Sequence, residues 1–269
     1  MKNTLSILIA LILCSALSAQ TTLIPDANFE QALINLGYDN FLNNYVTTAN
    51  INTVTFLNVN SLSISDLTGI EDFTALTYLG CYSNKLKSLD LSTNTALILL
   101  YCEDNQLSKL DVSGASALSL LNCSYNCLTS LDVSTNTALS TLDCHYNQLT
   151  SLDVSANTAL TTLYCHYNNL TSLDVSQNTA LTYLYCYSNQ LTSLDVSQNT
   201  ALTHLYCYYN QLTSLDVRNG NNINMTQCNS TSNPFLYCVN VDDVAWSIAN
   251  WKVAKGNIDA RQYFSTNCQ

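Results

Sequence analysis

The chain repeats itself every 21 residues over most of its length. The unit reads L-x-x-L-x-C-x-x-N-x-L-x-x-L-D-V-S-x-N-T-A, and Leu181 to Ala201 is one copy. Inward and outward side chains alternate around Leu79-x-Cys81, which is the period of a strand. A unit of this size cannot bury its apolar side alone, so neighbouring units must stack. The repeat therefore predicts a solenoid with one short strand per coil.

The strand segment resembles the leucine-rich repeat, whose motif is L-x-x-L-x-L-x-x-N-x-L, with Cys at the third Leu position. The match runs from about Val54 to Cys228, and it resembles in particular exported bacterial repeats of the internalin kind, of the Bacteroidetes type. A last, degraded coil keeps Ile223 and Cys228 and is interpreted as lacking the Leu and the Asn. The resemblance implies a β-rich solenoid of the α/β class. Its parallel concave sheet has eight or nine short strands, with short extended or 3₁₀ segments on the convex side.

Four segments are expected: a signal peptide (1–19), an N-terminal cap (20–53), the leucine-rich repeats (54–232) and a C-terminal cap (233–269). Lys2, the apolar run from Leu5 to Leu13 and the small residues that follow have the layout of a secretory signal peptide. That run is too short to cross a bilayer, and no later run is long and apolar enough, so no transmembrane span is expected. The protein is therefore expected to be secreted or at the cell surface.

The ends of a solenoid need caps, because the outermost coils have no neighbour on one side. The segment from Asp26 to Leu36 predicts a helical N-terminal cap. Asp26 is a suitable N-cap residue, Phe29 and Leu33 lie near helical spacing with Leu36, and Gly37 ends the segment. The C-terminal cap contains Val, Trp, Tyr and Phe residues that are available to cover the last coil.

The cysteines divide by position. Seven follow the 21-residue period and are interpreted as buried free thiols, in preference to disulfides between coils or a metal-binding stripe. These seven are Cys81, Cys102, Cys123, Cys144, Cys165, Cys186 and Cys207. Cys228 keeps the spacing and is interpreted as their last member, whereas Cys127 is expected to be exposed and unpaired. A disulfide between Cys238 and Cys268 is expected to hold the C-terminal cap, as is common in exported proteins.

Asn and Asp also recur once per coil. The Asn follows each strand and is expected to satisfy backbone groups of adjacent coils. The Asp is expected to accept hydrogen bonds from nearby N–H or hydroxyl groups in an Asx-type turn. A row of Ca²⁺ sites is the alternative, although one carboxylate per coil is few for an ion that binds six to eight oxygens. The two rows are Asn84, Asn105, Asn126, Asn147, Asn168, Asn189 and Asn210, and Asp90, Asp111, Asp132, Asp153, Asp174, Asp195 and Asp216.

The outward strand positions do not repeat, and they are rich in aromatic residues. Thirteen of the 17 Tyr and all three His lie on or beside this one face. The candidate ligand-binding residues are Tyr82, Tyr101, Tyr125, His145, Tyr146, Tyr164, His166, Tyr167, Tyr183, Tyr185, Tyr187, His204, Tyr206, Tyr208 and Tyr209. Tyr suits recognition because it offers a large rigid contact area with a polar end. The alternative is that Tyr merely favours strands, and that His145 and His166 are stacked or solvated rather than metal ligands.

The net charge of −11 argues against nucleic acid as a partner, and no cation occurs between Lys109 and Arg218. The sequence has no Gly-rich phosphate loop, metal-ligand motif or Ser/His/Asp set, so no enzymatic activity and no cofactor are expected. A non-catalytic recognition module that binds a protein or glycan through the Tyr-rich concave face is therefore expected, and the resemblance implies adhesion or contact with a host or neighbouring cell. A structural surface or matrix protein without a specific ligand is the alternative.

Overall fold

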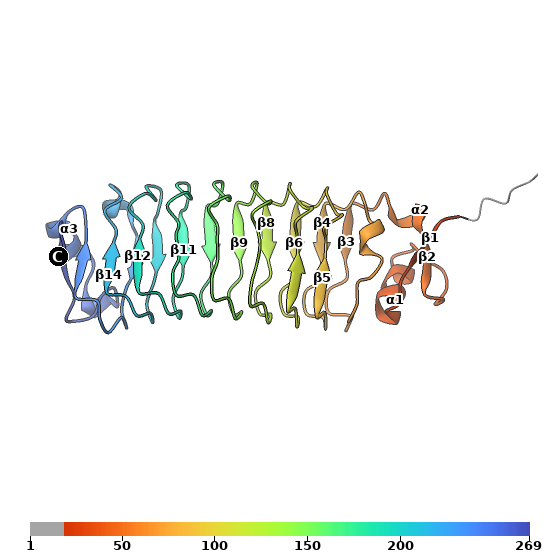
Figure 1. The fold of residues 1–269 in the computed structure, drawn as a ribbon, viewed down its shortest axis with the longest axis horizontal. Coiled ribbons are helices and arrows are strands. Elements are labelled where there is room, and N and C mark those ends of the chain that lie inside the picture. Colours follow the sequence, from red (N-terminus) through yellow and green to blue (C-terminus); the bar gives the residue numbers. More distant parts are fainter. Residues whose placement is uncertain (1–18) are drawn as a thin grey trace, which may run out of the picture.

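The computed structural model describes residues 19–269, so the predicted signal peptide (1–19) lies outside them except for its last residue. The described residues form a solenoid whose coils stack along one long axis (Figure 1). Nine strands of this part of the chain form a parallel sheet along the repeats, which confirms the expected leucine-rich repeat architecture. In spatial order the strands are β3 (Phe56–Asn58), β4 (Tyr78–Gly80), β6 (Leu99–Tyr101), β8 (Leu120–Asn122), β9 (Thr141–Asp143), β10 (Thr162–Tyr164), β11 (Tyr183–Tyr185), β13 (His204–Tyr206) and β15 (Gln227–Asn229).

Equivalent residues of neighbouring coils lie side by side in this sheet. Leu163 of β10 is beside Leu184 of β11, which in turn is beside Leu205 of β13. These leucines are fully buried, and so are the cysteines two residues after them. Successive strand residues face opposite sides, so the residues between them point outward. The repeat thus builds one continuous apolar core and leaves one continuous outer face.

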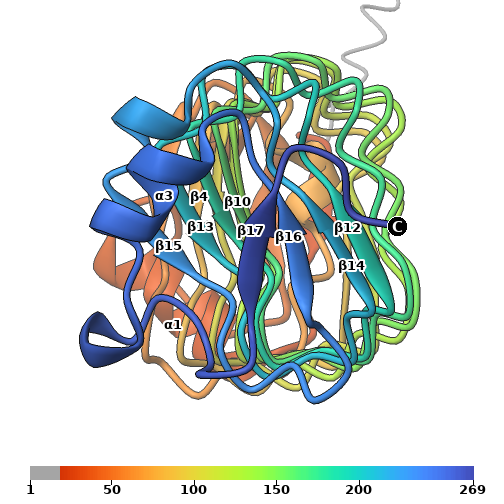
Figure 2. The ribbon, with the colours of Figure 1, turned by 90° about the vertical axis from the view of Figure 1, so that its left-hand side faces the viewer.

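Further short strands lie on another side of the coils, as the view along the solenoid shows (Figure 2). They come from the S-L-D segment of the repeat and from the C-terminal cap. These strands are β5 (Ser88–Asp90), paired with β7 (Lys109–Asp111), and the sheet of β12 (Ser193–Asp195), β14 (Ser214–Asp216), β16 (Cys238–Asn240) and β17 (Tyr263–Ser265). Three 3₁₀ turns also occur among residues 19–269: η1 (Ile70–Asp72), η2 (Asn222–Asn224) and η3 (Val253–Lys255). The expected short extended and 3₁₀ segments are confirmed.

The N-terminal end contains β1 (Thr21–Leu23), α1 (Ala27–Asn35), β2 (Tyr45–Thr47) and α2 (Thr48–Ile51), with β1 and β2 antiparallel. Asp26 caps α1 as expected, because its Oδ1 accepts from the N–H groups of Asn28 and Phe29. Its Oδ2 accepts from the backbone N–H and hydroxyl of Ser65, which ties the helix to the first coil. Phe29 and Leu33 are buried, whereas Leu36, which was expected to belong to the helix, lies just after its last residue and is exposed.

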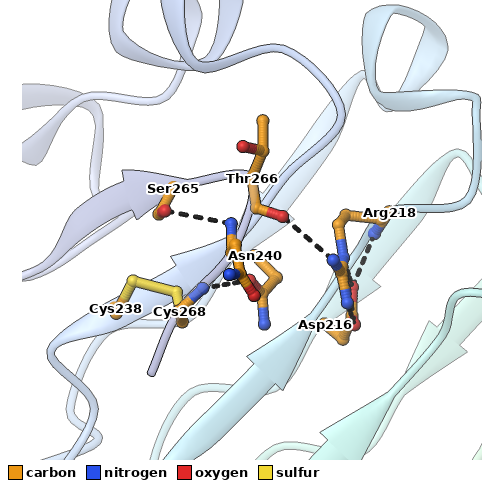
Figure 3. Close-up of a disulfide and its surroundings, with 8 residues drawn as sticks. Asp216, Arg218, Cys238, Asn240, Ser265, Thr266 and Cys268 are labelled. Atoms are coloured by element: carbon orange, nitrogen blue, oxygen red, sulfur yellow. Dashed lines mark hydrogen bonds and ion pairs between the residues drawn. A yellow bond between two sulfur atoms is a disulfide. The ribbon is translucent and has the colours of Figure 1, made fainter.

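The C-terminal end consists of β16, α3 (Val244–Asn250), η3 and β17. Cys238 and Cys268 form the expected disulfide, with Cα atoms 5.8 Å apart (Figure 3). Beside it, the Asn240 Oδ1 accepts from the Cys268 N–H (2.7 Å), and the Arg218 Nη1 donates to the Thr266 carbonyl (2.9 Å). These contacts attach the chain end to the last coils. No helix of residues 19–269 is long and apolar enough to cross a membrane.

The last coil corrects one part of the sequence interpretation. In the pairing of β13 with β15, Cys228 lies beside Leu205, so it occupies a Leu position rather than the end of the cysteine row. Leu205 and Cys228 are 23 residues apart, two more than the 21-residue period of the preceding coils. Met225 is therefore buried where a Leu would be, and Ile223, which was expected to be retained in the core, is exposed.

The same two-residue insertion moves the final Asn. Asn233, 23 residues after Asn210, donates from Nδ2 to the Cys207 carbonyl (3.1 Å) and accepts at Oδ1 from the Leu212 N–H (3.1 Å). The expectation that the last coil lacks its Asn was therefore wrong. The constant 21-residue spacing predicted the wrong register for this coil, because an insertion in a turn changes the register without disturbing the core.

Candidate functional site

The Asn row holds the chain in the same conformation after each strand. In Asn147, Nδ2 donates to the Cys123 carbonyl of the preceding coil (3.0 Å) and to the Cys144 carbonyl of its own coil (3.2 Å). Its Oδ1 accepts from the Leu128 N–H (2.9 Å). The pattern recurs in the neighbouring coils. The structural role expected for this row is confirmed, and the row keeps the outer face regular.

A second row of buried Asn was missed in the sequence. Asn157 donates from Nδ2 to the carbonyls of Val133 and Asn136, both at 2.9 Å. The signal was present as the Asn of D-V-S-x-N-T-A, which has the same period. The row comprises Asn94, Asn136, Asn157, Asn178 and Asn199. It supports the turns far from the aromatic face.

The cysteine and aspartate rows also have structural roles. The seven ladder cysteines are buried free thiols, and burial raises the pKa of each, whereas Cys127 is exposed and free, as expected. Each Asp caps its own turn: the Asp153 Oδ1, for example, accepts from the Ser155 N–H (2.9 Å). The expected Asx-type turn is confirmed. Among residues 19–269 no group of three or more His, Cys, Asp and Glu side chains is placed to hold a metal ion.

The outward side chains of the nine-stranded sheet form the candidate site, here called the Tyr-rich face. All fifteen predicted residues lie on it or at its edge. Those on the strands are Tyr101, Tyr164, Tyr183, Tyr185, His204 and Tyr206. At the second position after the end of a strand lie Tyr82, His145, His166, Tyr187 and Tyr208. At the third position lie Tyr125, Tyr146, Tyr167 and Tyr209. The face brings them together because each coil places equivalent residues about 4.8 Å apart.

This coil spacing suits aromatic stacking. His145, His166, Tyr187 and Tyr208 form one row, with successive ring centroids 4.4, 4.3 and 4.3 Å apart. A second row contains Tyr125, Tyr146 and Tyr167, with centroid distances of 4.6 and 4.1 Å. On the strands, the ring centroid of Tyr185 lies 4.8 Å from that of Tyr164 and 4.7 Å from that of Tyr206. The C-terminal half of the face is therefore a nearly continuous aromatic surface.

Four tyrosines of this face have a strained backbone. Tyr125, Tyr146, Tyr167 and Tyr209 have φ between 49° and 52°, in the left-handed region. An L-residue with a bulky side chain pays about 1–2 kcal/mol there, whereas Asn and Gly adopt this region more readily. The equivalent residues of other coils are Ser83, Asp104 and Ser188. Because these positions lie outside the strands, the strand preference of Tyr does not explain the four rings.

The histidines take part in the stacking. The imidazoles of His145 and His166 are nearly parallel, and their in-plane nitrogen lone pairs therefore do not converge on a shared ion. The Asp143 carboxylate pairs with Nδ1 of His145. His166 is buried, and its Nδ1 has no hydrogen-bond partner. Burial, followed by the neighbouring His145, lowers the pKa of His166 to about 4, so this imidazole is neutral at pH 7.

Comparison with known proteins supports the repeat assignment. Residues 158–199 match a family model described as leucine-rich repeats, two copies. The functional domain of InlJ from Listeria monocytogenes, which includes a cysteine ladder, is 36% identical, with a TM-score of 0.60 over 84% of this chain and 58% of that one. A leucine-rich repeat protein of Leptospira interrogans is 23% identical, with a TM-score of 0.54 over 76% of this chain and 59% of that one.

Internalin C2 of Listeria monocytogenes is 19% identical, with a TM-score of 0.55 over 92% of this chain and 98% of that one. The Leptospira protein and internalin C2 are similar in fold alone. The chain spans less than two thirds of the InlJ domain and of the Leptospira protein. No curated protein matches the sequence. The repeat, the sheet and these similarities together identify a leucine-rich repeat solenoid that is structurally similar to Listeria internalins.

Proposed function

We propose that this chain is a non-catalytic recognition module, secreted or displayed at the cell surface, that binds a protein or glycan through the Tyr-rich face. The observation that carries the proposal is the left-handed backbone of Tyr125, Tyr146, Tyr167 and Tyr209. Backbone strain is typically retained where a side chain is needed for function. A matrix protein without a ligand would gain stability from Asn at these positions, so a purely structural role does not account for them.

Three further observations support the proposal. A contiguous exposed aromatic patch is uncommon on a protein that has no partner. The Cys238–Cys268 disulfide suits an oxidising compartment, in agreement with the predicted signal peptide. The similarity to InlJ is consistent with an exported bacterial protein, which we propose to be of the Bacteroidetes type and to act in adhesion or contact with a host or neighbouring cell.

Glycan and cell-surface protein arrays test the proposal. The binding variant replaces Tyr185, Tyr187 and Tyr206 by Ser. The matched control makes the same change to Ser at Tyr45, Tyr237 and Tyr263, three exposed tyrosines outside the face. We expect the wild type and the control to bind the same ligand and the binding variant to lose it. The proposal fails if the wild type binds nothing or if both triple variants bind equally well.

A further inference from the structure

The aromatic surface is interrupted at the coil of β8. Asn122 and Ser124 occupy positions where other coils carry Tyr or His, and the Ser124 hydroxyl donates to the Asn122 Oδ1 (2.8 Å). The preceding coil presents Glu103 and the following coil presents Asp143. The two carboxylates therefore belong to coils about 10 Å apart, with small polar side chains between them. Asn122 is partly exposed and Ser124 is buried, so these small polar side chains form a floor between the two carboxylates.

Neither carboxylate has a Lys or Arg partner within the face. The Glu103 Oε2 is shielded from solvent and has no hydrogen-bond partner. The Asp143 Oδ1 accepts from the backbone N–H of His145 (3.3 Å) and pairs with Nδ1 of the same residue. Burial, followed by the charges of Asp143 and Asp104, raises the pKa of Glu103. No Lys or Arg occupies an outward position of the nine-stranded sheet. A cation brought by a ligand would relieve this unbalanced negative charge.

Aromatic rings flank the same place. Tyr101, the last residue of β6, lies two residues before Glu103. Tyr125 follows Ser124, and Tyr164 of β10 is paired with Asp143 in the sheet. A guanidinium group stacks on tyrosine rings and also forms bidentate hydrogen bonds with carboxylates. An ammonium group is a compact charge that lacks this planar, bidentate geometry. The combination of flanking rings and two carboxylates favours Arg over Lys. A neutral glycan would leave both carboxylates unmatched.

We infer that the ligand of the Tyr-rich face is a protein that inserts an arginine side chain between Glu103 and Asp143, above Asn122 and Ser124. This inference rests on the proposed function and narrows its ligand class. Burial of a paired guanidinium at the centre of an aromatic surface would make this arginine a dominant contact. The neighbouring tyrosines would then cover the rest of the bound segment and exclude water from the ion pair.

The test is selection of a random 12-residue phage-displayed peptide library on the wild-type protein, followed by fluorescence anisotropy with the enriched peptides. The site variant is Glu103→Gln with Asp143→Asn, which keeps the side-chain shapes. The control variant, Asp132→Asn with Asp153→Asn, makes the same change of charge on the exposed Asp row. We expect the enriched peptides to contain Arg. Their affinity should be at least about tenfold lower for the site variant than for the wild type, and replacing that Arg by citrulline should cause a similar loss with the wild type. For the control variant the affinity should change by less than about twofold.

Several results would overturn the inference: no enriched peptide, peptides that bind without Arg, or equal losses on the two variants. Thermal melting of both variants shows whether the fold is retained. A ligand that needs Tyr185, Tyr187 and Tyr206 but not Glu103 and Asp143 would leave the proposed function standing and refute the arginine contact. A glycan from the arrays with that behaviour would do the same. If neither the arrays nor the library yields a ligand, both proposals fail.

Discussion

Replacement of Asn147 by Ala tests how the repeat is held together. Asn147 lies in a central coil, and its side chain satisfies the Leu128 N–H and the carbonyls of Cys123 and Cys144. Alanine can make none of these bonds. Because the side chain is buried between two coils, water cannot easily replace it.

The expected loss follows from these three backbone groups. A buried polar group that loses its partner costs about 1–3 kcal/mol, and some relaxation of the turn is expected. We therefore expect the free energy of unfolding to fall by about 3–5 kcal/mol, a large share of the roughly 5–15 kcal/mol typical of a folded domain. Since each coil contacts only its neighbours, the loss should also weaken the coupling between the two halves of the solenoid.

Urea unfolding followed by circular dichroism and Trp fluorescence measures this loss. The matched control is Gln148→Ala at the next residue, whose side chain is exposed and whose N–H donates to the Leu128 carbonyl in both proteins. This control should change stability by less than about 0.5 kcal/mol. A loss below about 1 kcal/mol for Asn147→Ala, or equal losses for the two variants, would refute the proposed role of the Asn row.

Three further outcomes are expected. Of the nine free thiols in residues 19–269, only Cys127 should react with iodoacetamide in the native protein, because the others are buried and have raised pKa values; mass spectrometry would detect labelling elsewhere. Replacing Cys238 and Cys268 by Ala should cost about 3–4 kcal/mol for a loop of 30 residues, measurable as a lower melting temperature. The pKa of His166 is about 4 in the folded protein, below its unfolded value of 6.5. Its contribution to the free energy of unfolding should therefore be fully present above pH 6.5 and decrease as the pH falls toward 4, by up to about 2 kcal/mol after screening by solvent. His166→Gln should remove that decline, and an unchanged pH profile in this variant would exclude His166 as its source.

The regular coils could be predicted because one period governs every buried position. Leu163, Cys165 and Asn168 recur in each coil, and each has one physical role in packing or backbone satisfaction. The register of the last coil could not be predicted from this period. Cys228 falls on the 21-residue period by coincidence, and the true register depends on the burial of Met225 and the bonds of Asn233 across coils.

The candidate face was predictable in its membership but not in its detail. Alternation along the strands places Tyr164 and Tyr185 outward, and the coil spacing then brings them together. The left-handed backbone of Tyr146 was not predictable, because Tyr ordinarily disfavours that region. The unbalanced charge at Glu103 also depends on burial by neighbouring coils, which sequence spacing does not describe.

Ligand binding at the Tyr-rich face is tested most directly by hydroxyl-radical footprinting of the protein with and without the ligand that the arrays identify. Tyr125, Tyr146, Tyr167 and Tyr209 should become protected on binding. The tyrosines outside the face, Tyr45, Tyr237 and Tyr263, are similarly exposed and should react equally in both states. Protection confined to the tyrosines outside the face, or unchanged reactivity of all seven in the bound state, would contradict binding at this surface.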